Sequence, residues 1–262
     1  KSVIKNIADN FQKAAVYNNM FDEEELKWLY GFAFSRCHQV RHNDNGTMFI
    51  SGNLETIYKK FATKINAVIP GAENSPVVGG NFFITPSQYG LHNDSTRESD
   101  WTNTLKQTPL DHPQRKYVPW RNIIIPIYTC LPGVESHGVF FNQRHVDFAH
   151  VYHHGKRPDQ KVATTYPIVT NHEDIDFHLR DGSLQSKPSN LLEYDTKHFE
   201  EYLYYTPKRR LTGLTPELTC SWQVGCPIVF DAVQLHATNK GFKDKEWTTK
   251  MGLLLTFLRE IK

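Results

Sequence analysis

Near residue 78 the hydrophobic periodicity of this sequence changes from helical to strand-like, and it stays strand-like almost to the end. The later segments are short, rich in β-branched or aromatic residues, and separated by Gly, Pro, Asn or Asp. Short strands that follow two helices predict a mainly β fold, a barrel or sandwich with helices on one side. The predicted strands are 81–85, 122–128, 138–141, 163–169, 218–224, 228–230 and 250–258.

Two helices are predicted before the strands begin. Segment 20–36 has Asp22 as a candidate N-cap, acidic residues in the first turn, and apolar residues at helical spacing. Segment 54–68 carries one apolar stripe and is followed by Pro70-Gly71, which ends a helix. The polar residues 42–46 between the helices predict a turn. Apolar stripes usually face a core, so we expect both helices to support the sheet and to carry no catalytic residue.

At 262 residues, the chain is long enough for one large β domain, and we expect a single domain over 1–262. Within it, 1–78 is the expected helical support and 79–258 the expected β core. The long, polar region at about 144–215 is interpreted as an insertion or lid. Pro126 interrupts an Ile-rich strand and predicts either a β-bulge or an edge position there.

Charge and cysteine content narrow the class of protein. Lys and Arg number 30 against 28 Asp and Glu, so the net charge of +2 gives no reason to expect nucleic acid as a partner. No apolar run approaches the roughly 18 residues of a membrane span, and we expect a cytoplasmic protein without a membrane partner. The four cysteines show no CxxC spacing, which favours reduced thiols. The sequence leaves the oligomeric state open.

A candidate metal site follows the first long strand, in the stretch 79–95. This stretch is predicted to be an aromatic-rich strand that delivers His92 and Asp94 at its end. Side chains two apart on a strand point the same way, so an imidazole and a carboxylate from this segment can converge on one metal ion. Four His-x-Asp pairs occur in the chain, so the tripeptide alone identifies nothing. Only His92/Asp94 both follows an aromatic strand and precedes enough strands to close a barrel; the others are His42/Asp44, His145/Asp147 and His172/Asp174.

The third ligand is predicted in the segment 222–239. Gly225 and Pro227 mark a turn, residues 228–230 form a short buried strand, and His236 follows shortly after. In isolation, a hydrogen-bonded loop histidine is the better interpretation of His236. Together with the earlier pair it completes a set of two His and one carboxylate. Such a facial triad leaves three coordination positions open and suits non-haem Fe(II) oxygenases. The predicted catalytic and metal-binding residues are His92, Asp94 and His236.

These segments resemble the superfamily of 2-oxoglutarate- and Fe(II)-dependent oxygenases over roughly 81–258. The motif QYGLHND is similar to the first-ligand segment of prolyl-hydroxylase-like members, and GCPIVFDAVQLH is similar to the segment that ends in their distal His. The strands at 121–128 and 138–141 resemble those that follow the first ligands in that group. The resemblance implies a double-stranded β-helix, also called a jelly roll or cupin-like barrel, buttressed by the N-terminal helices.

The resemblance also implies Fe(II), 2-oxoglutarate as cosubstrate, and O₂. In this superfamily a cation on the strand after the distal His binds the far carboxylate of 2-oxoglutarate. Lys250 opens such a strand, although Arg is the commoner residue and the spacing from His236 is somewhat long. Tyr128 and Asn81 are further candidates for binding the cosubstrate. The implied reaction hydroxylates an unactivated C–H bond of a small-molecule or peptide substrate and releases succinate and CO₂.

Two other functions use the same residues. A zinc-dependent hydrolase could hold Zn²⁺ with two His and one carboxylate, although the sequence lacks an HExxH helix. A non-catalytic cupin-like binding protein is the second alternative. In that protein, substitution of Lys250 would leave ligand binding unchanged.

Overall fold

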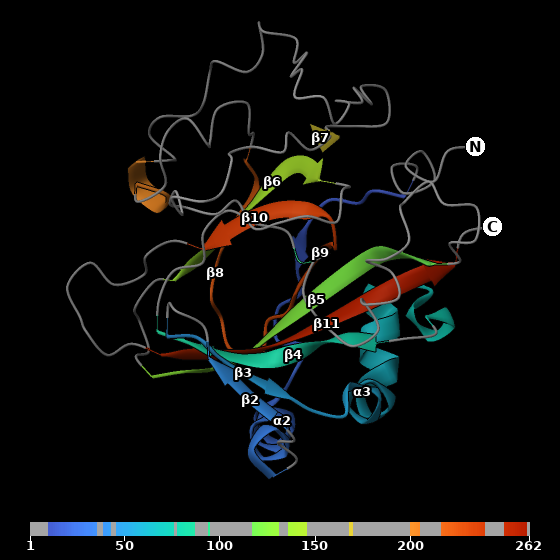
Figure 1. Ribbon diagram of the computed structural model, residues 1–262, viewed down its shortest axis with the longest axis vertical. Coiled ribbons are helices and arrows are strands. Elements are labelled where there is room, and N and C mark those ends of the chain that lie inside the picture. The colour runs from blue at the N-terminus through green and yellow to red at the C-terminus, as the bar shows by residue number, and fades with distance from the viewer. Residues whose placement is uncertain are drawn as a thin grey trace, which may run out of the picture.

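The computed structural model describes residues 10–35, 39–42, 46–75, 78–86, 94, 117–130, 136–145, 168–169, 200–204, 216–238 and 249–260. Within them the protein is mainly β, with two antiparallel sheets and two α-helices beside the larger sheet (Figure 1). Of the proposed insertion at 144–215, only 144–145, 168–169 and 200–204 are among the described residues.

Both predicted helices are confirmed. Helix α2 spans Glu23–Ser35 and is capped by Asp22, whose Oδ1 accepts a hydrogen bond of 2.9 Å from the backbone N–H of Glu25. In return, Glu25 accepts a hydrogen bond of 2.9 Å from the backbone N–H of Asp22, which completes a capping box. Helix α3 spans Leu54–Val68 and starts at the N-cap Asn53. A single 3₁₀ turn, η1 (Ala72–Asn74), follows it.

The larger sheet has the strand order β1-β9-β5-β11-β4-β3-β2, and the smaller sheet has the order β10-β6-β7 with β8 also paired to β6. Neighbouring strands in both sheets are antiparallel. The larger sheet contains β1 (Ala15–Val16), β2 (Gln39–His42), β3 (Met48–Ser51), β4 (Val78–Thr85), β5 (Tyr117–Thr129), β9 (Ile228–Asp231) and β11 (Lys250–Glu260). The smaller sheet contains β6 (His137–His145), β7 (Ile168–Val169), β8 (Pro216–Ser221) and β10 (Gln234–Thr238).

The strand order makes this protein a double-stranded β-helix, as predicted. The chain passes from β5 in the larger sheet to β6 in the smaller one, and returns from β8 to β9. It then crosses to β10 and returns to β11, which lies between β4 and β5 (Figure 1). This winding between two facing sheets is the jelly-roll topology. The sheets remain separate and do not close into one continuous barrel.

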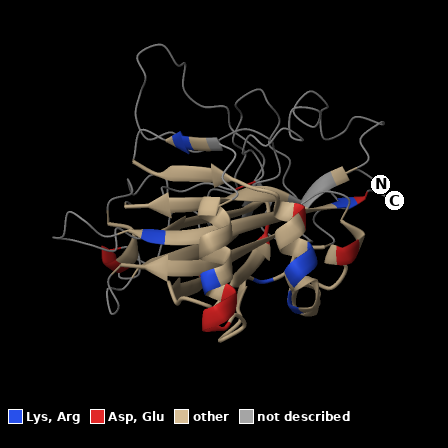
Figure 2. Ribbon diagram, turned by 90° about the horizontal axis from the view of Figure 1, so that it is seen from below, with Lys and Arg blue, Asp and Glu red and all other residues tan. Residues whose placement is uncertain are grey.

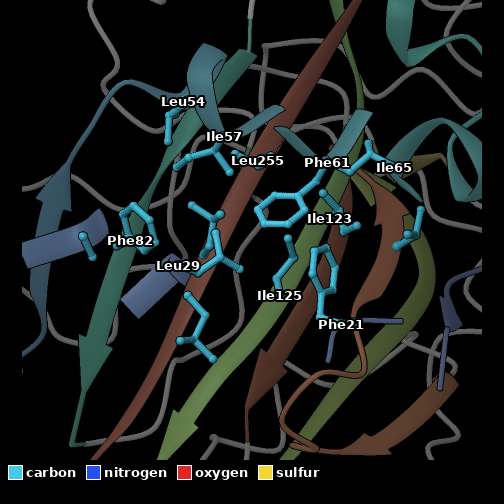
Figure 3. Packing of buried hydrophobic residues seen from close by; sticks show 14 of the residues in the cluster. Phe21, Leu29, Leu54, Ile57, Phe61, Ile65, Phe82, Ile123, Ile125 and Leu255 are labelled. Carbon is cyan, nitrogen blue, oxygen red and sulfur yellow. The ribbon is translucent and has the colours of Figure 1, made fainter. Parts of the chain in front are cut away.

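The core lies between the larger sheet and the two helices. Residues of one face of β11 belong to the same buried cluster as apolar residues of α2 and α3. Figure 3 shows Leu29 and Ile57 of the helices facing Ile125 of β5 and Leu255 of β11. Because side chains alternate along a strand, the opposite face of β11 points between the sheets. The residues of that inner face are Lys250, Gly252, Leu254 and Thr256.

Strand β5 has a β-bulge next to Pro126, which is one of the two predicted outcomes. Met251 of β11 pairs with Tyr128, and the next residue, Gly252, pairs with Pro126, so Ile127 is an extra residue on β5. The alternative of an edge strand is wrong, because β5 lies between β9 and β11. The bulge reverses the alternation of side chains beyond it.

A buried ion pair links β5 and β9. Arg121 and Asp231 lie opposite each other in the sheet register, and the guanidinium donates a hydrogen bond to the carboxylate. Arg121 also donates to the carbonyl of Asn10, and Asp231 accepts from the backbone N–H of Gln12 at 3.1 Å. The pair therefore fastens the segment before β1 to the larger sheet.

Charged residues are otherwise sparse in the sheets. Figure 2 shows that the acidic and basic residues of the described chain lie mostly on the helices and near strand ends. Within the described ranges, Cys130, Cys220 and Cys226 form no disulfide. No helix among the described residues has the length and apolarity needed to cross a membrane.

Candidate metal centre

His236 lies in the middle of β10 and is 4% exposed. Its ring stacks on Phe140 at a centroid distance of 5.4 Å and meets the edge or face of Phe230 at 4.8 Å. Its Nδ1 lies 3.0 Å from the backbone carbonyl of Gln234. A carbonyl oxygen only accepts hydrogen bonds, so Nδ1 carries a proton and Nε2 is the atom available for a metal.

Asp94, the second predicted metal ligand, lies next to His236 in the interior. The carboxylate is 6% exposed, and its Oδ2 lies 3.4 Å from Nε2 of His236. Two ligand atoms about 2.1 Å from one metal ion are about 3.0 Å apart at a right angle and about 3.4 Å apart at a tetrahedral angle. Two buried acceptors at this separation require a cation, either a proton on Nε2 or a metal ion bound by both atoms. The pair therefore fits one edge of a metal coordination sphere.

His92, the remaining predicted ligand, lies outside the described residues and stays a prediction. The described ranges alone hold no group of three possible metal ligands. They supply Asp94 and His236, which are 142 positions apart in sequence and come together through the fold.

Asn122 of β5, in the larger sheet, contacts Asp94. It was not among the residues predicted from the sequence. It is fully buried, and its Nδ2 donates a hydrogen bond of 3.1 Å to Oδ2 of Asp94. Its Oδ1 is also buried but has no hydrogen-bond partner. The available signal was a polar residue at the start of the Ile-rich run 123–125, where buried apolar residues are the rule.

Lys250 is buried between the sheets, as predicted. Its Nζ donates a hydrogen bond of 2.8 Å to Oγ of Ser136 and lies 4.8 Å from the ring centroid of Trp222. Burial lowers the pKa of Lys250 from 10.5 to about 8, because the charged ammonium loses its hydration. At neutral pH the side chain is still mostly protonated, so a positive charge lies inside the fold.

No carboxylate within the described ranges pairs with this charge. The thiol of Cys220 is close enough to influence Lys250, but burial raises the pKa of that thiol to about 12. The thiol is therefore neutral at physiological pH. A hydroxyl and an indole face compensate the ammonium only partly, and an anionic ligand would complete its surroundings.

Gly252 provides the space beside Lys250. A Cβ atom at this position would lie 2.6 Å from Cζ of Phe83 and 2.7 Å from Cη2 of Trp222. The ring centroids of Phe83 and Trp222 are 5.9 Å apart, and the Trp222 ring lies against the ammonium. A glycine on β11 thus allows Trp222 to approach the strand and to lie against Lys250.

The two other predicted cosubstrate residues lie on opposite faces of the larger sheet. Asn81 pairs with Leu254 on the inner face, is 9% exposed, and has a buried Oδ1 without a hydrogen-bond partner. Tyr128 pairs with Met251, is 45% exposed, and lies 6.1 Å from Tyr30 of α2. The bulge at Pro126 turns it away from Lys250. Its placement gives the predicted role of Tyr128 no support, whereas that of Asn81 remains a candidate.

Comparison with known proteins gives distant structural similarity only. No protein-family model and no curated protein sequence matches this chain. The crystal structure of SnoN, a non-haem α-ketoglutarate-dependent epimerase from nogalamycin biosynthesis, is 8% identical with a TM-score of 0.46, over 97% of this chain and 80% of that one. A prolyl-4-hydroxylase from Pseudomonas putida is 9% identical with a TM-score of 0.44, over 98% of both chains. HygX from Streptomyces hygroscopicus, with nickel, 2-oxoglutarate and hygromycin B bound, is 13% identical with a TM-score of 0.43, over 96% of this chain and 84% of that one.

Proposed function

We propose that this protein is a 2-oxoglutarate- and Fe(II)-dependent dioxygenase that uses O₂ to hydroxylate an unactivated C–H bond. The metal ligands are His92, Asp94 and His236, and Lys250 binds the far carboxylate of 2-oxoglutarate. The observation that carries the proposal is the buried ammonium of Lys250, which has no carboxylate partner among the described residues and shares the interior with the Asp94–His236 pair. Zinc-dependent hydrolysis as such does not require this second cation.

The spacing between the two ends of the site is of the same order as the length of a keto-dicarboxylate. Ser136, which contacts Lys250, is four positions before Phe140, the register partner of His236. Four residues of extended chain span about 13 Å. The terminal carbons of 2-oxoglutarate are about 5 Å apart. A metal bond of about 2 Å and a hydrogen bond of about 3 Å extend that reach to about 10 Å, comparable with the spacing along the strand.

The bound metal and cosubstrate would supply the oxidising chemistry by oxidative decarboxylation of 2-oxoglutarate to succinate and CO₂. The protein's own residues orient these groups and keep water out. Phe140 and Phe230 hold the ring of His236, and the hydrogen bond from Nδ1 to the carbonyl of Gln234 leaves Nε2 as the nitrogen that can bind the metal. Asn81, with an unpartnered amide oxygen on the same inner face, is available to a bound ligand. The substrate is a small molecule or a peptide.

Anaerobic reconstitution tests the proposal. Fe(II) and 2-oxoglutarate added together to the apoprotein should produce the weak visible charge-transfer band of the chelate. The band should be absent in His92→Ala and His236→Ala, and Lys250→Met should require a much higher 2-oxoglutarate concentration. Thr256→Val, an inner-face substitution of a residue with no proposed ligand, is the matched control. Full absorption in the two histidine variants, or wild-type protein that binds Zn²⁺ but forms no chelate, would refute the assignment.

A further inference from the structure

Asn122 connects the candidate metal centre to an interior strand of the larger sheet. It lies on β5, which is paired with β9 on one side and β11 on the other, opposite Phe230 and Thr256. Its side chain is 0% exposed and points between the sheets. A backbone that is hydrogen-bonded on both sides gives this side chain a fixed starting point.

The orientation of the amide is determined by its partner. Nδ2 lies 3.1 Å from Oδ2 of Asp94, and only the NH₂ group can donate to a carboxylate oxygen. The same Oδ2 lies 3.4 Å from Nε2 of His236. Asn122 therefore contacts the carboxylate oxygen that faces the histidine, and the three side chains form one connected row between the sheets.

Asn122 is poorly suited to a purely structural role. Its Oδ1 is buried without a hydrogen-bond partner, and an unsatisfied buried acceptor costs about 1 to 3 kcal/mol. Ile124, the next inner-face residue of β5, is apolar and packs in the interior. An apolar residue at 122 would avoid the unsatisfied oxygen, so the amide is explained by what its NH₂ group does to Asp94.

We propose that Asn122 is a positioning residue that fixes the carboxylate of Asp94 for metal binding. This inference rests on the proposed function only through the assignment of Asp94 and His236 as ligands. A carboxylate rotates about its Cβ–Cγ bond and can bind a metal through one oxygen or through both. The hydrogen bond from Asn122 restricts that rotation and keeps Oδ2 beside Nε2 of His236. Such partners of a ligand change metal affinity by about 10- to 100-fold when they are removed.

The test is metal binding without turnover, in the full chain. The apoprotein is titrated anaerobically with Co(II), and the d–d absorption bands report both the affinity and the coordination geometry. Asn122→Leu should raise the Kd for Co(II) about 10- to 100-fold and change the position or intensity of the bands. Thr256→Val, which removes a polar group from the neighbouring position of the register, should leave the Kd within twofold and the bands unchanged.

Unfolding of the apoproteins in urea separates positioning from support of the fold. Asn122→Leu should unfold close to the wild-type midpoint, because the lost hydrogen bond is offset by removal of the unsatisfied oxygen. If Asn122→Leu does not fold, Asn122→Ser, which is polar but too short to reach Asp94, is expected to weaken Co(II) binding in the same way. A variant that binds Co(II) within twofold of the wild type, with the same bands, overturns the inference.

The wild-type protein distinguishes the two possible failures. If the wild-type protein binds Co(II) but then forms no complex with 2-oxoglutarate, the proposed function is overturned. In that case, weaker Co(II) binding by Asn122→Leu would still support the role of Asn122 in metal binding. Wild-type protein that binds no Co(II) would overturn both.

Discussion

Replacement of Lys250 by methionine should stabilise the metal-free protein. Burial lowers the pKa of Lys250 from 10.5 to about 8, and each pKa unit corresponds to about 1.4 kcal/mol. The charged ammonium therefore costs the folded protein about 3 kcal/mol at pH 7. Methionine has a similar length and carries no charge, but it loses the hydrogen bond to Ser136. We expect a net gain of about 2 kcal/mol in the free energy of unfolding for Lys250→Met at pH 7.

The gain should depend on pH in a defined direction. Between pH 8 and pH 10.5, the folded wild-type protein binds fewer protons than the unfolded chain, because the pKa of Lys250 is lower in the folded state. The stability of the wild type therefore rises with pH in this window. The advantage of Lys250→Met should be complete below pH 8 and should disappear as the pH approaches 10.5.

Urea unfolding at pH 7 and pH 9.5 measures both effects, since the difference between variant and wild type removes the titration of all other groups. Lys59→Met is the matched control, because Lys59 is exposed on α3 in a pair with Glu55; it should change stability by less than about 0.5 kcal/mol at either pH. The affinity for 2-oxoglutarate should fall by about 10- to 100-fold in Lys250→Met. A variant that is less stable than the wild type at pH 7, or whose difference does not change with pH, would refute the reasoning.

Two further substitutions test the fold around the site. Gly252→Ala brings a methyl group within 2.7 Å of the Trp222 ring, so we expect a loss of about 1 to 3 kcal/mol in urea unfolding; a loss below 0.5 kcal/mol would contradict the close approach of the ring. Asp231→Asn leaves the guanidinium of Arg121 buried without its carboxylate, and we expect a loss of about 3 to 5 kcal/mol. Glu55→Gln, in an exposed pair, is its control at less than about 0.5 kcal/mol, and equal effects of the two substitutions would argue against a buried pair.

Hydrophobic periodicity predicts the helices and strands that bury one face and expose the other. Helix α3 was bounded correctly at 54–68, because its apolar stripe is continuous and Pro70-Gly71 follows it. Strands β2 and β3 are not predicted from the sequence, because their segments QVRH and MFIS are short and mixed; His42, the first residue of the predicted turn 42–46, belongs to β2. Strand β10 was interpreted as a loop, because Gln234 and His236 are polar residues at fully buried positions.

Candidate ligands could be proposed from the sequence where they follow a local motif, and contacts between distant residues could not. Asp94 and His236 were identified by their place after strands, and the fold brings them together. Asn122 and Ser136 contact partners 28 and 114 positions away, which no local pattern encodes. Tyr128 shares the parity of Asn122 along β5, but the extra residue at the bulge moves it to the face that carries the helices.

The residues on the two faces of strand β11 have opposite effects on the stability of this protein. Its helix-facing residues Met251, Leu253 and Leu255 belong to the apolar cluster shared with α2 and α3, where close packing stabilises the fold. Its inner face starts with a charge that burial makes unfavourable, followed by a glycine that lets Trp222 reach that charge. Neither residue contributes to packing as a leucine would. The inner-face arrangement lowers the stability of the protein when no ligand is bound. The proposed binding of an anion at Lys250 would compensate this cost, and it would explain why a strand so well packed on one side carries an ammonium on the other.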